Sequence, residues 1–364
     1  MSVTQSHNVV TRPSVKPAPG EEAERVPARV IGSRAAAVVA SPGFTGRVVA
    51  VSSRSVYMLG LDGEILWLAP PDSAKHGRCI LAAFDPAPLA VGMRFDVHAQ
   101  CLRIGHGLEI DLSLASCWRL RQPTPHGRLP LDEVNVARSA ALAAVASLPN
   151  SRGLGPVIGV LAASTPISAG DTVAPGGDMV VDHAWPAISA IARACRRGDV
   201  PGMLAGGSEL IGLGPGLTPS GDDFVGGALF SAQTLGAVYP EVFGLTSASL
   251  QTFLERARPL TNHISFAILS DLARGHGPEA LHDFVTSQLR GESGHRSLEA
   301  AQRIVEIGHS SGYDLLAGAV TGMLLTEATN RRPGRRVGRH DSGVATVKHV
   351  GGRQSSWKPW GGIR

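Results

Sequence analysis

Short apolar runs, interrupted by turn residues, dominate the first third of the chain. Residues 94–99 and 108–112 alternate apolar and polar positions, as half-buried strands do. The tetrad Leu-Asp-Gly-Glu at 61–64 separates two further apolar runs with the composition of a hairpin turn. Many short strands of this kind predict a small β-rich domain, a barrel or a sandwich, over residues 30–122.

Beyond a proline-bearing linker at 122–127 the apolar spacing becomes helical. An alanine-rich segment at 132–148 begins with two acidic residues, which favour a helix N-terminus. Helical spacing recurs over residues 185–206, 222–237, 247–258, 260–275, 278–290, 295–308 and 313–329. The pattern therefore predicts an α+β protein in which a larger, mainly α-helical domain occupies residues 130–330.

The charge of the chain is concentrated at one end. Residues 331–364 contain nine Lys or Arg and one Asp and thus carry +8, so residues 1–330 carry −4 of the total of +4. This Gly-, Arg- and Ser-rich segment is predicted to be a basic, disordered tail, and residues 1–29 a disordered arm. Aromatic residues make up only 5% of the chain, so the sequence does not indicate a folded nucleic-acid-binding face. One hypothesis is that the tail associates with RNA, which predicts RNA binding that is lost when residues 331–364 are removed.

The four cysteines (Cys79, Cys101, Cys117 and Cys195) form no CxxC pair and no metal-ligand spacing, as is typical of reduced thiols. The sequence has no signal peptide and no apolar run of membrane-spanning length. We therefore expect a cytoplasmic protein without membrane association.

The most informative motif occurs twice. Residues 220–228 and 311–319 both read Ser-Gly-x-Asp, two apolar residues, one small residue and Gly-Ala. A glycine-bearing loop precedes each copy, at 212–219 and at 308–310. Two matching helix N-termini that converge on one site are therefore expected.

A purely structural interpretation exists for both copies. Ser220 with Asp223, and Ser311 with Asp314, have the spacing of a capping box. Capping leaves the glycine-rich lead and Thr218 unexplained, whereas free N–H groups at such a turn can hold a carboxylate or a phosphate.

The adjacent carboxylates Asp222 and Asp223 would repel such an anion. Either a metal ion lies between them, with Mg²⁺ as the candidate and its full ligand set unknown, or the substrate carries amide N–H donors beside its anionic group. A compact acid with a carbamoyl or ureido group would satisfy the second alternative.

Between the copies, residues 258–265 add further polar groups. Arg258 is the candidate carboxylate clamp, and Thr261 and Ser265 would lie one helical turn apart, lining a cleft or forming a polar outer face. His309 is a candidate for proton transfer, although a lone histidine more often has a structural role.

The stretch Gly-Pro-Gly-Leu-Thr-Pro-Ser-Gly-Asp-Asp at 214–223 resembles a family, formerly of unknown function, that includes the AllH-type subunit of oxamate carbamoyltransferase. The resemblance continues through 261–265 and 308–318 and extends over about residues 30–330. It implies a role in anaerobic purine (allantoin) catabolism, in a multi-subunit transferase that converts N-carbamoyl-oxamate and phosphate into oxamate and carbamoyl phosphate. It also implies partners, an FdrA-like and an AllG-like subunit.

The leading hypothesis is therefore a carbamoyltransferase subunit, and the alternative is a non-catalytic small-molecule-binding or scaffolding subunit. Whether the chain is itself catalytic stays open at this point. The catalytic candidates are Asp222, Asp223 and Asp314. The substrate-binding candidates are Gly214, Gly216, Thr218, Ser220, Gly221, Arg258, Thr261, Ser265, Ser310, Ser311 and Gly312.

Overall fold

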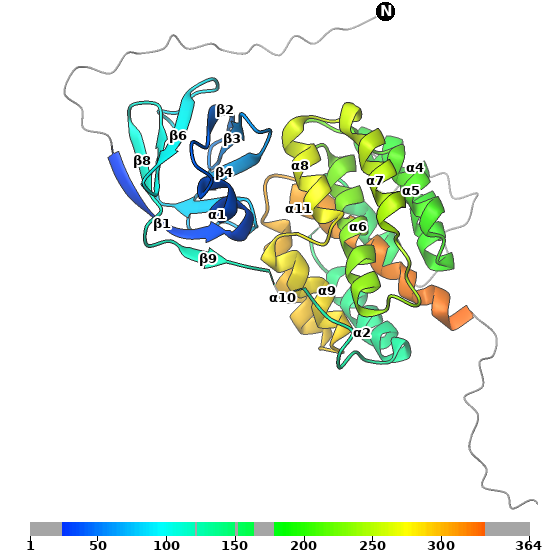
Figure 1. Cartoon of the computed structure of the whole chain (residues 1–364). Helices are drawn as coiled ribbons and strands as arrows, with labels where there is room; N and C mark the ends of the chain where they lie inside the picture. The colour runs from blue at the N-terminus through cyan, green and yellow to red at the C-terminus, as the bar shows by residue number, and fades with distance from the viewer. Residues whose placement is uncertain (1–23, 121, 150–151, 164–177, 332–364) are drawn as a thin grey trace, which may run out of the picture. The chain divides into compact units, whose positions relative to one another are not determined.

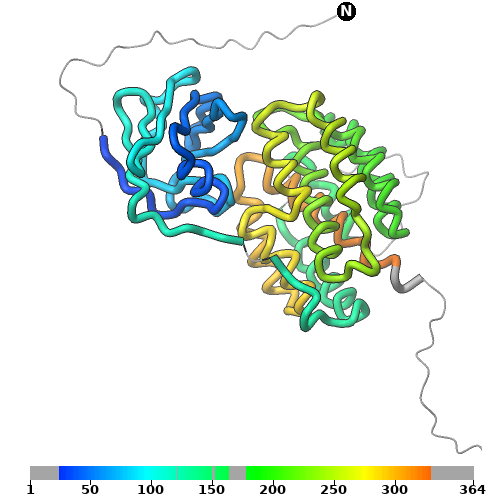
Figure 2. The backbone as a smooth tube through the Cα atoms, viewed as in Figure 1, coloured from blue at the N-terminus to red at the C-terminus, as the bar shows by residue number. Residues whose placement is uncertain are grey.

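A computed structural model describes residues 24–120, 122–149, 152–163 and 178–331 of the chain. It confirms the predicted α+β class, because a β barrel at 24–118 is followed by a helical region (Figure 1). Figure 2 traces the same path from the first strands in blue to the last helices in orange. Residues 1–23 of the predicted N-terminal arm, and the basic tail beyond Arg331, lie outside the described residues. Residues 24–29 were also expected in the arm, but they begin the first strand of the barrel.

The barrel closes through its first strand. The strands are β1 (Glu24–Gly32), β2 (Thr45–Val51), β3 (Val56–Gly60), β4 (Ile65–Ala69), β5 (Cys79–Ala82), β6 (Arg94–His98), β7 (Cys101–Ile104), β8 (Leu108–Asp111) and β9 (Ser116–Trp118). Their order is β5-β4-β3-β2-β6-β7-β8-β1-β9, and β1 also pairs with β5 in antiparallel register, Ala28 opposite Ala82. Strands β1 to β8 therefore form a closed ring, which leaves no open edge among them.

Local sequence explains much of this barrel. Alternation in β6 and β8 places Phe95 and Ile110 in a buried apolar cluster. The predicted hairpin at 61–64 joins β3 to β4, with Gly63 at φ +85° and the Gly60 N–H bonded to the Glu64 carbonyl at 2.8 Å. A short helix, α1 (Ser33–Val39), follows β1.

Ten further α-helices are described after the barrel. They are α2 (Leu131–Val145), α3 (Pro156–Ala162), α4 (Met179–Arg197), α5 (Val200–Ser208), α6 (Ser220–Val238), α7 (Ser247–Ala257), α8 (His263–Leu272), α9 (Glu279–Leu289), α10 (Gly294–Val305) and α11 (Ser311–Met323), with 3₁₀ turns at Arg258–Leu260 and Leu324–Arg331. No helix among these described segments is long and apolar enough to cross a bilayer.

One expectation about the helices was wrong, and one helix was not expected. The helix expected at 185–206 is two helices, because Gly198 ends α4 with a left-handed φ of +71° and the Asp199 side chain caps α5 by accepting from the Gly202 N–H. Helix α3 was not predicted, since its seven residues lie in a glycine- and proline-bearing stretch without clear periodicity.

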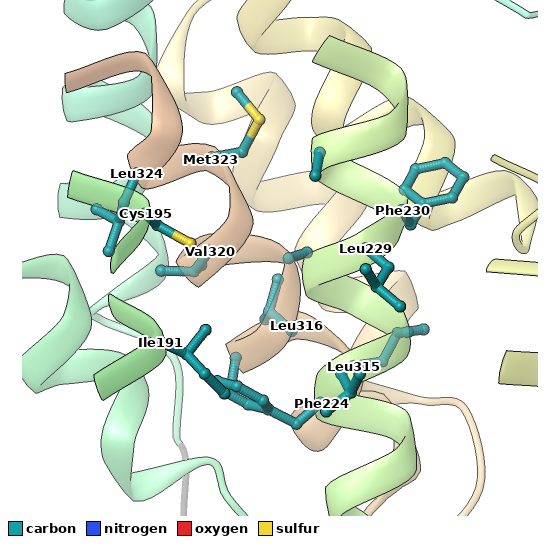
Figure 3. Close-up of a cluster of buried hydrophobic side chains, with 14 of the residues drawn as sticks. Ile191, Cys195, Phe224, Leu229, Phe230, Leu315, Leu316, Val320, Met323 and Leu324 are labelled. Atoms are coloured by element: carbon teal, nitrogen blue, oxygen red, sulfur yellow. The ribbon is translucent and has the colours of Figure 1, made fainter. Parts of the chain in front are cut away.

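The helices α6 and α11 pack against each other as closely as backbones allow. A methyl group at Gly227 would overlap the carbonyl oxygen of Leu315, and one at Gly318 would overlap that of Phe224. Gly318 lies against Phe224, and one turn later Gly322 lies against Ala228, so the contacts advance in the same direction along both helices. The pair therefore runs parallel, and the Thr218–Ser311 contact places both N-termini at one end. Figure 3 shows apolar side chains from this pair together with Ile191 and Cys195 of α4 in the buried core.

Helix α8 also contacts the barrel. A buried ion pair joins Arg78 to Asp271 through two hydrogen bonds of 2.5 and 2.9 Å, and the Arg78 guanidinium also donates to Glu64 at 2.9 Å. Ile264, near the start of α8, packs in an apolar cluster with Ala50 and Ile65 of the barrel.

Candidate functional site

Both copies of the repeated motif begin a helix at their serine. The N-cap positions are Pro219 and Ser310, and neither makes a side-chain capping bond. The predicted capping boxes were therefore wrong: the N–H groups of Asp223 and Asp314 are hydrogen-bonded to the backbone carbonyls of Pro219 and Ser310. Each aspartate is the fourth residue of its helix, and its side chain is available for other contacts.

The structure brings the two turns together. The hydroxyls of Thr218 and Ser311 are 2.7 Å apart, although 93 residues separate them in the chain. Both hydroxyls act on Asp223, because hydrogen bonding to them lowers the pKa of its carboxyl group. The expectation that two distant helix starts converge is thus confirmed.

The second aspartate is held in a related way. Asp314 is fully buried, and its Oδ1 accepts from the backbone N–H of Leu154 at 2.5 Å. The hydroxyls of Ser220 and Ser310 lie against the same side chain and lower its pKa. Residues from α6, α11 and the turn before α3 therefore enclose this carboxyl group.

Asp222 has a different environment from its neighbour. Its Oδ1 accepts from the Gly212 N–H at 2.6 Å, and its Oδ2 accepts from the Ser265 hydroxyl at 2.5 Å and from the Thr261 hydroxyl. Both oxygens are engaged by protein donors, so Asp222 fixes the glycine-rich loop to the start of α8. Thr261 and Ser265 contact this aspartate, which is how the structure places the predicted pair.

Burial sets the protonation of the other two aspartates. It raises the pKa of Asp223 well above its usual range, and the charge of Asp314 raises it further. Burial likewise raises the pKa of Asp314 to about 6, against the opposing effect of its hydrogen-bond donors. Groups with pKa values shifted toward neutrality are suited to exchanging protons with a ligand.

The four glycines predicted to bind substrate have two different structural roles. Gly214 and Gly216 have φ values of +108° and +101°, which only glycine adopts easily, so they shape the loop before α6. Gly221 and Gly312 are buried where a side chain would overlap the carbonyl oxygens of Leu210 and of Ile304 respectively. The second pair thus fits both helix starts against the preceding chain.

Two predicted polar residues lie at the surface. Arg258 is exposed, with its guanidinium 5.7 Å from the centre of the Phe266 ring, so in this structure it stacks on an aromatic side chain. His309 is also exposed, and its carbonyl accepts from Arg152 at 3.4 Å.

Two contributors to the site lie outside the motifs and were not predicted from the sequence. Tyr57 on β3 belongs to the apolar cluster that joins the barrel to α8, and its pKa is raised by burial and then by the charge of Asp223. The Leu154 N–H is 160 residues from its partner Asp314. No local pattern marks either residue, because both act through tertiary proximity.

No cluster of three or more His, Cys, Asp or Glu side chains suited to a metal ion is present in the part of the chain that the structure describes. A pocket of about 270 Å³ lies elsewhere, and it is lined by Gln233, Leu245, Ser247, Leu250, Gln251, Leu254 and Arg274. The candidate site is therefore the enclosed group of hydroxyls and carboxyls between the starts of α6 and α11.

The fold and site define a protein with an N-terminal β barrel and a helical region, in which paired helix N-termini enclose two unusual carboxyl groups. Residues 210–323 match the family described as oxamate carbamoyltransferase subunit AllH. This segment contains every site residue predicted from the sequence, and the match confirms the resemblance to that family over these residues. No solved structure matches the chain.

Proposed function

We propose that this chain is a subunit of an oxamate carbamoyltransferase-type complex in the cytoplasm. In the reaction, an oxygen of phosphate bonds to the carbamoyl carbon of N-carbamoyl-oxamate as the bond from that carbon to the oxamate nitrogen breaks. The departing nitrogen takes up the proton that the phosphate releases, giving oxamate and carbamoyl phosphate. Such a step needs groups that can hold a proton and stabilise the developing charge.

One observation carries the proposal: two helix N-termini meet around Asp223 and Asp314, beside Thr218 and Ser311. Backbone N–H groups and hydroxyls can hydrogen-bond to the carboxylate and carbonyl oxygens of the substrate. The carboxyl groups can accept from its ureido N–H groups. Gly216 and Leu217 are exposed in the loop that leads to this site, so a shift of that loop would admit a compact acid.

The partners and the cation also belong to this proposal. An FdrA-like and an AllG-like subunit would complete the enzyme and supply the groups that the chain does not provide. A requirement for Mg²⁺ would appear as turnover that falls on chelation and returns when the cation is added.

The test is carbamoyl phosphate formation in a complex reconstituted from this chain and the two candidate partners. Asp223→Asn should lower kcat/KM by about 10²–10⁴-fold, the range for general acid–base groups. Asp182→Asn is the matched control, because Asp182 is an exposed residue in the first turn of α4. Unchanged turnover in Asp223→Asn would remove the proposed role.

The enclosed position of Asp314 favours a second candidate, a scaffolding subunit that does not bind substrate. In that case the close packing of α6 and α11 would serve assembly alone. Calorimetric titration of the isolated chain with N-carbamoyl-oxamate separates the two functions, since the scaffold would show no binding while the reconstituted complex retained its turnover.

A further inference from the structure

Asp223 and Asp314 occupy equivalent positions in a two-fold arrangement. Each is the fourth residue of its helix, and the pKa of each is lowered by the hydroxyl of the first residue of the other helix. Ser311 of α11 contacts Asp223, and Ser220 of α6 contacts Asp314. The repeat in the sequence is therefore a repeat in space, with the two carboxyl groups on either side of its axis.

Each of these carboxyl groups has one oxygen without a partner. Oδ2 of Asp223 and Oδ2 of Asp314 are buried and receive no hydrogen bond, and the two residues are 6% and 0% exposed. Buried polar atoms without partners are uncommon and costly in folded proteins. Two unpartnered acceptors at one enclosed place indicate that a ligand or a proton completes them.

We propose that Asp223 and Asp314 share a single proton and together bind a carbamoyl group, with the protonated carboxyl donating to its oxygen and the ionised carboxyl accepting from its NH₂. Asp222 then acts only as a positioning residue, because donors from the protein occupy both of its oxygens.

The chemistry of the pair fits this ligand class. Two adjacent ionised carboxylates repel each other, so a buried pair retains one proton over a broad pH range. A singly protonated pair offers one O–H donor and one anionic acceptor, which matches the C=O and N–H groups of a carbamoyl group. The positive N-terminal ends of α6 and α11 stabilise the remaining negative charge.

The charged and titratable groups around the two aspartates are compatible with a shared proton. Asp222 from α6 and Tyr57 from β3 lie on the side of Asp223. On the side of Asp314, Arg152 bonds to the carbonyl of His309 in the preceding turn. The helix N-termini and hydroxyl groups therefore provide the immediate stabilisation of the charge.

Infrared spectroscopy of the full chain tests the shared proton without any ligand. At pH 7 the wild-type protein should show a protonated-carboxyl band that Asp223→Asn abolishes and Asp222→Asn retains. In Asp314→Asn the band should titrate at a lower pH than in the wild type, because the neighbouring charge is gone. A band that neither Asp223→Asn nor Asp314→Asn alters would overturn the shared proton.

Calorimetry with N-carbamoyl-oxamate and with methylurea tests the ligand class, which alone rests on the proposed function. Affinity should follow a bell-shaped pH profile that rises as the pH passes about 6, where the first carboxyl group ionises, and falls at higher pH, where the remaining proton leaves the pair. It should drop at least about tenfold in Asp223→Asn and in Asp314→Asn, that is, by about 1.4 kcal/mol or more, and stay unchanged in Asp182→Asn.

These outcomes separate the two proposals. Methylurea binding that depends on both aspartates, in a complex that makes no carbamoyl phosphate, would sustain carbamoyl recognition and refute the transferase. Absence of binding by either probe, with the infrared band present, would refute carbamoyl recognition. Circular dichroism melting of each variant verifies that it is folded.

Discussion

The starts of α6 and α11 share a sequence but differ in what surrounds them. Both have serine at the first helical residue, glycine at the second and aspartate at the fourth, and both carry a glycine at the eighth that contacts the other helix. They differ at the third residue, where α6 has Asp222 and α11 has Tyr313. Asp222 fastens the loop and α8, whereas Tyr313 has no such function.

This difference distinguishes two kinds of sequence position in the repeated motif. Positions common to both copies face the shared space between the helices, permit close helix packing or, at the second residue, fit the helix start against the preceding chain. The position that differs serves the local anchoring of one copy. A repeated residue in this chain therefore indicates the common site, and an unrepeated one indicates its support. Substitutions in the two classes should affect different measurable quantities.

The largest effect on stability is expected at the unrepeated position. Asp222→Ala leaves three donors without their acceptor, those of Gly212, Thr261 and Ser265, and should lower the free energy of unfolding by about 3 to 5 kcal/mol. Urea denaturation measures this loss. Asp223→Asn, at the repeated position, should cost less than about 1 kcal/mol, and equal losses in the two variants would remove the distinction.

A pH-dependent effect is expected at the repeated position. The folded-state pKa of Asp314 is raised to about 6, so its stabilising contribution is complete below pH 4 and is lost as the pH rises through 6. By pH 8, Asp314→Asn should gain about 3 kcal/mol relative to the wild type, compared with pH 4. Parallel stability curves for the two proteins would show that Asp314 does not titrate in this window.

The contact between the two helices gives the next effect. Gly318→Ala would force a methyl group into the carbonyl of Phe224 and should cost about 1 to 3 kcal/mol. Gly159→Ala is the control, because a methyl group there meets open space within α3, and it should be neutral or stabilising by up to about 1 kcal/mol. Thermal melting compares them, and a tolerated Gly318→Ala would mean that the helices can separate.

The smallest effect is expected at Arg258, which lies outside both copies. Because its guanidinium stacks on Phe266, Arg258→Ala should cost about 0.5 to 1 kcal/mol of stability. Binding of N-carbamoyl-oxamate, measured by calorimetry, should change less than twofold. A large loss of affinity would instead restore the carboxylate clamp expected from the sequence.

Local signals in the sequence were enough for the fold class and for the helix starts. The hairpin at 61–64 and the alternation in β6 and β8 follow from turn chemistry and period-two patterning. The convergence of the two serines could be expected because the motif is repeated. The division of α4 from α5 could also have been expected, since Gly198 followed by Asp199 is a helix stop followed by a cap.

The roles within the site could not be predicted in the same way. Ser-x-x-Asp spacing indicates a capping box, yet the helices begin at the serines, and the aspartates turn to partners across the helix pair. Which of Asp222 and Asp223 is saturated depends on Thr261 and Ser265, and only the folded chain shows those contacts. The same holds for Leu154, whose N–H reaches Asp314 through tertiary packing.

Helix α8 links the barrel to the candidate site in the helical region. Near one end of this ten-residue helix, the Ser265 hydroxyl donates a hydrogen bond to Asp222. Near its other end, Asp271 forms a buried ion pair with Arg78. Removing the strands would take away the guanidinium that pairs with Asp271 and the apolar residues against which Ile264 packs, and would so weaken the support of the glycine loop. Residues 210–323, expressed alone, should therefore be less stable than the whole chain.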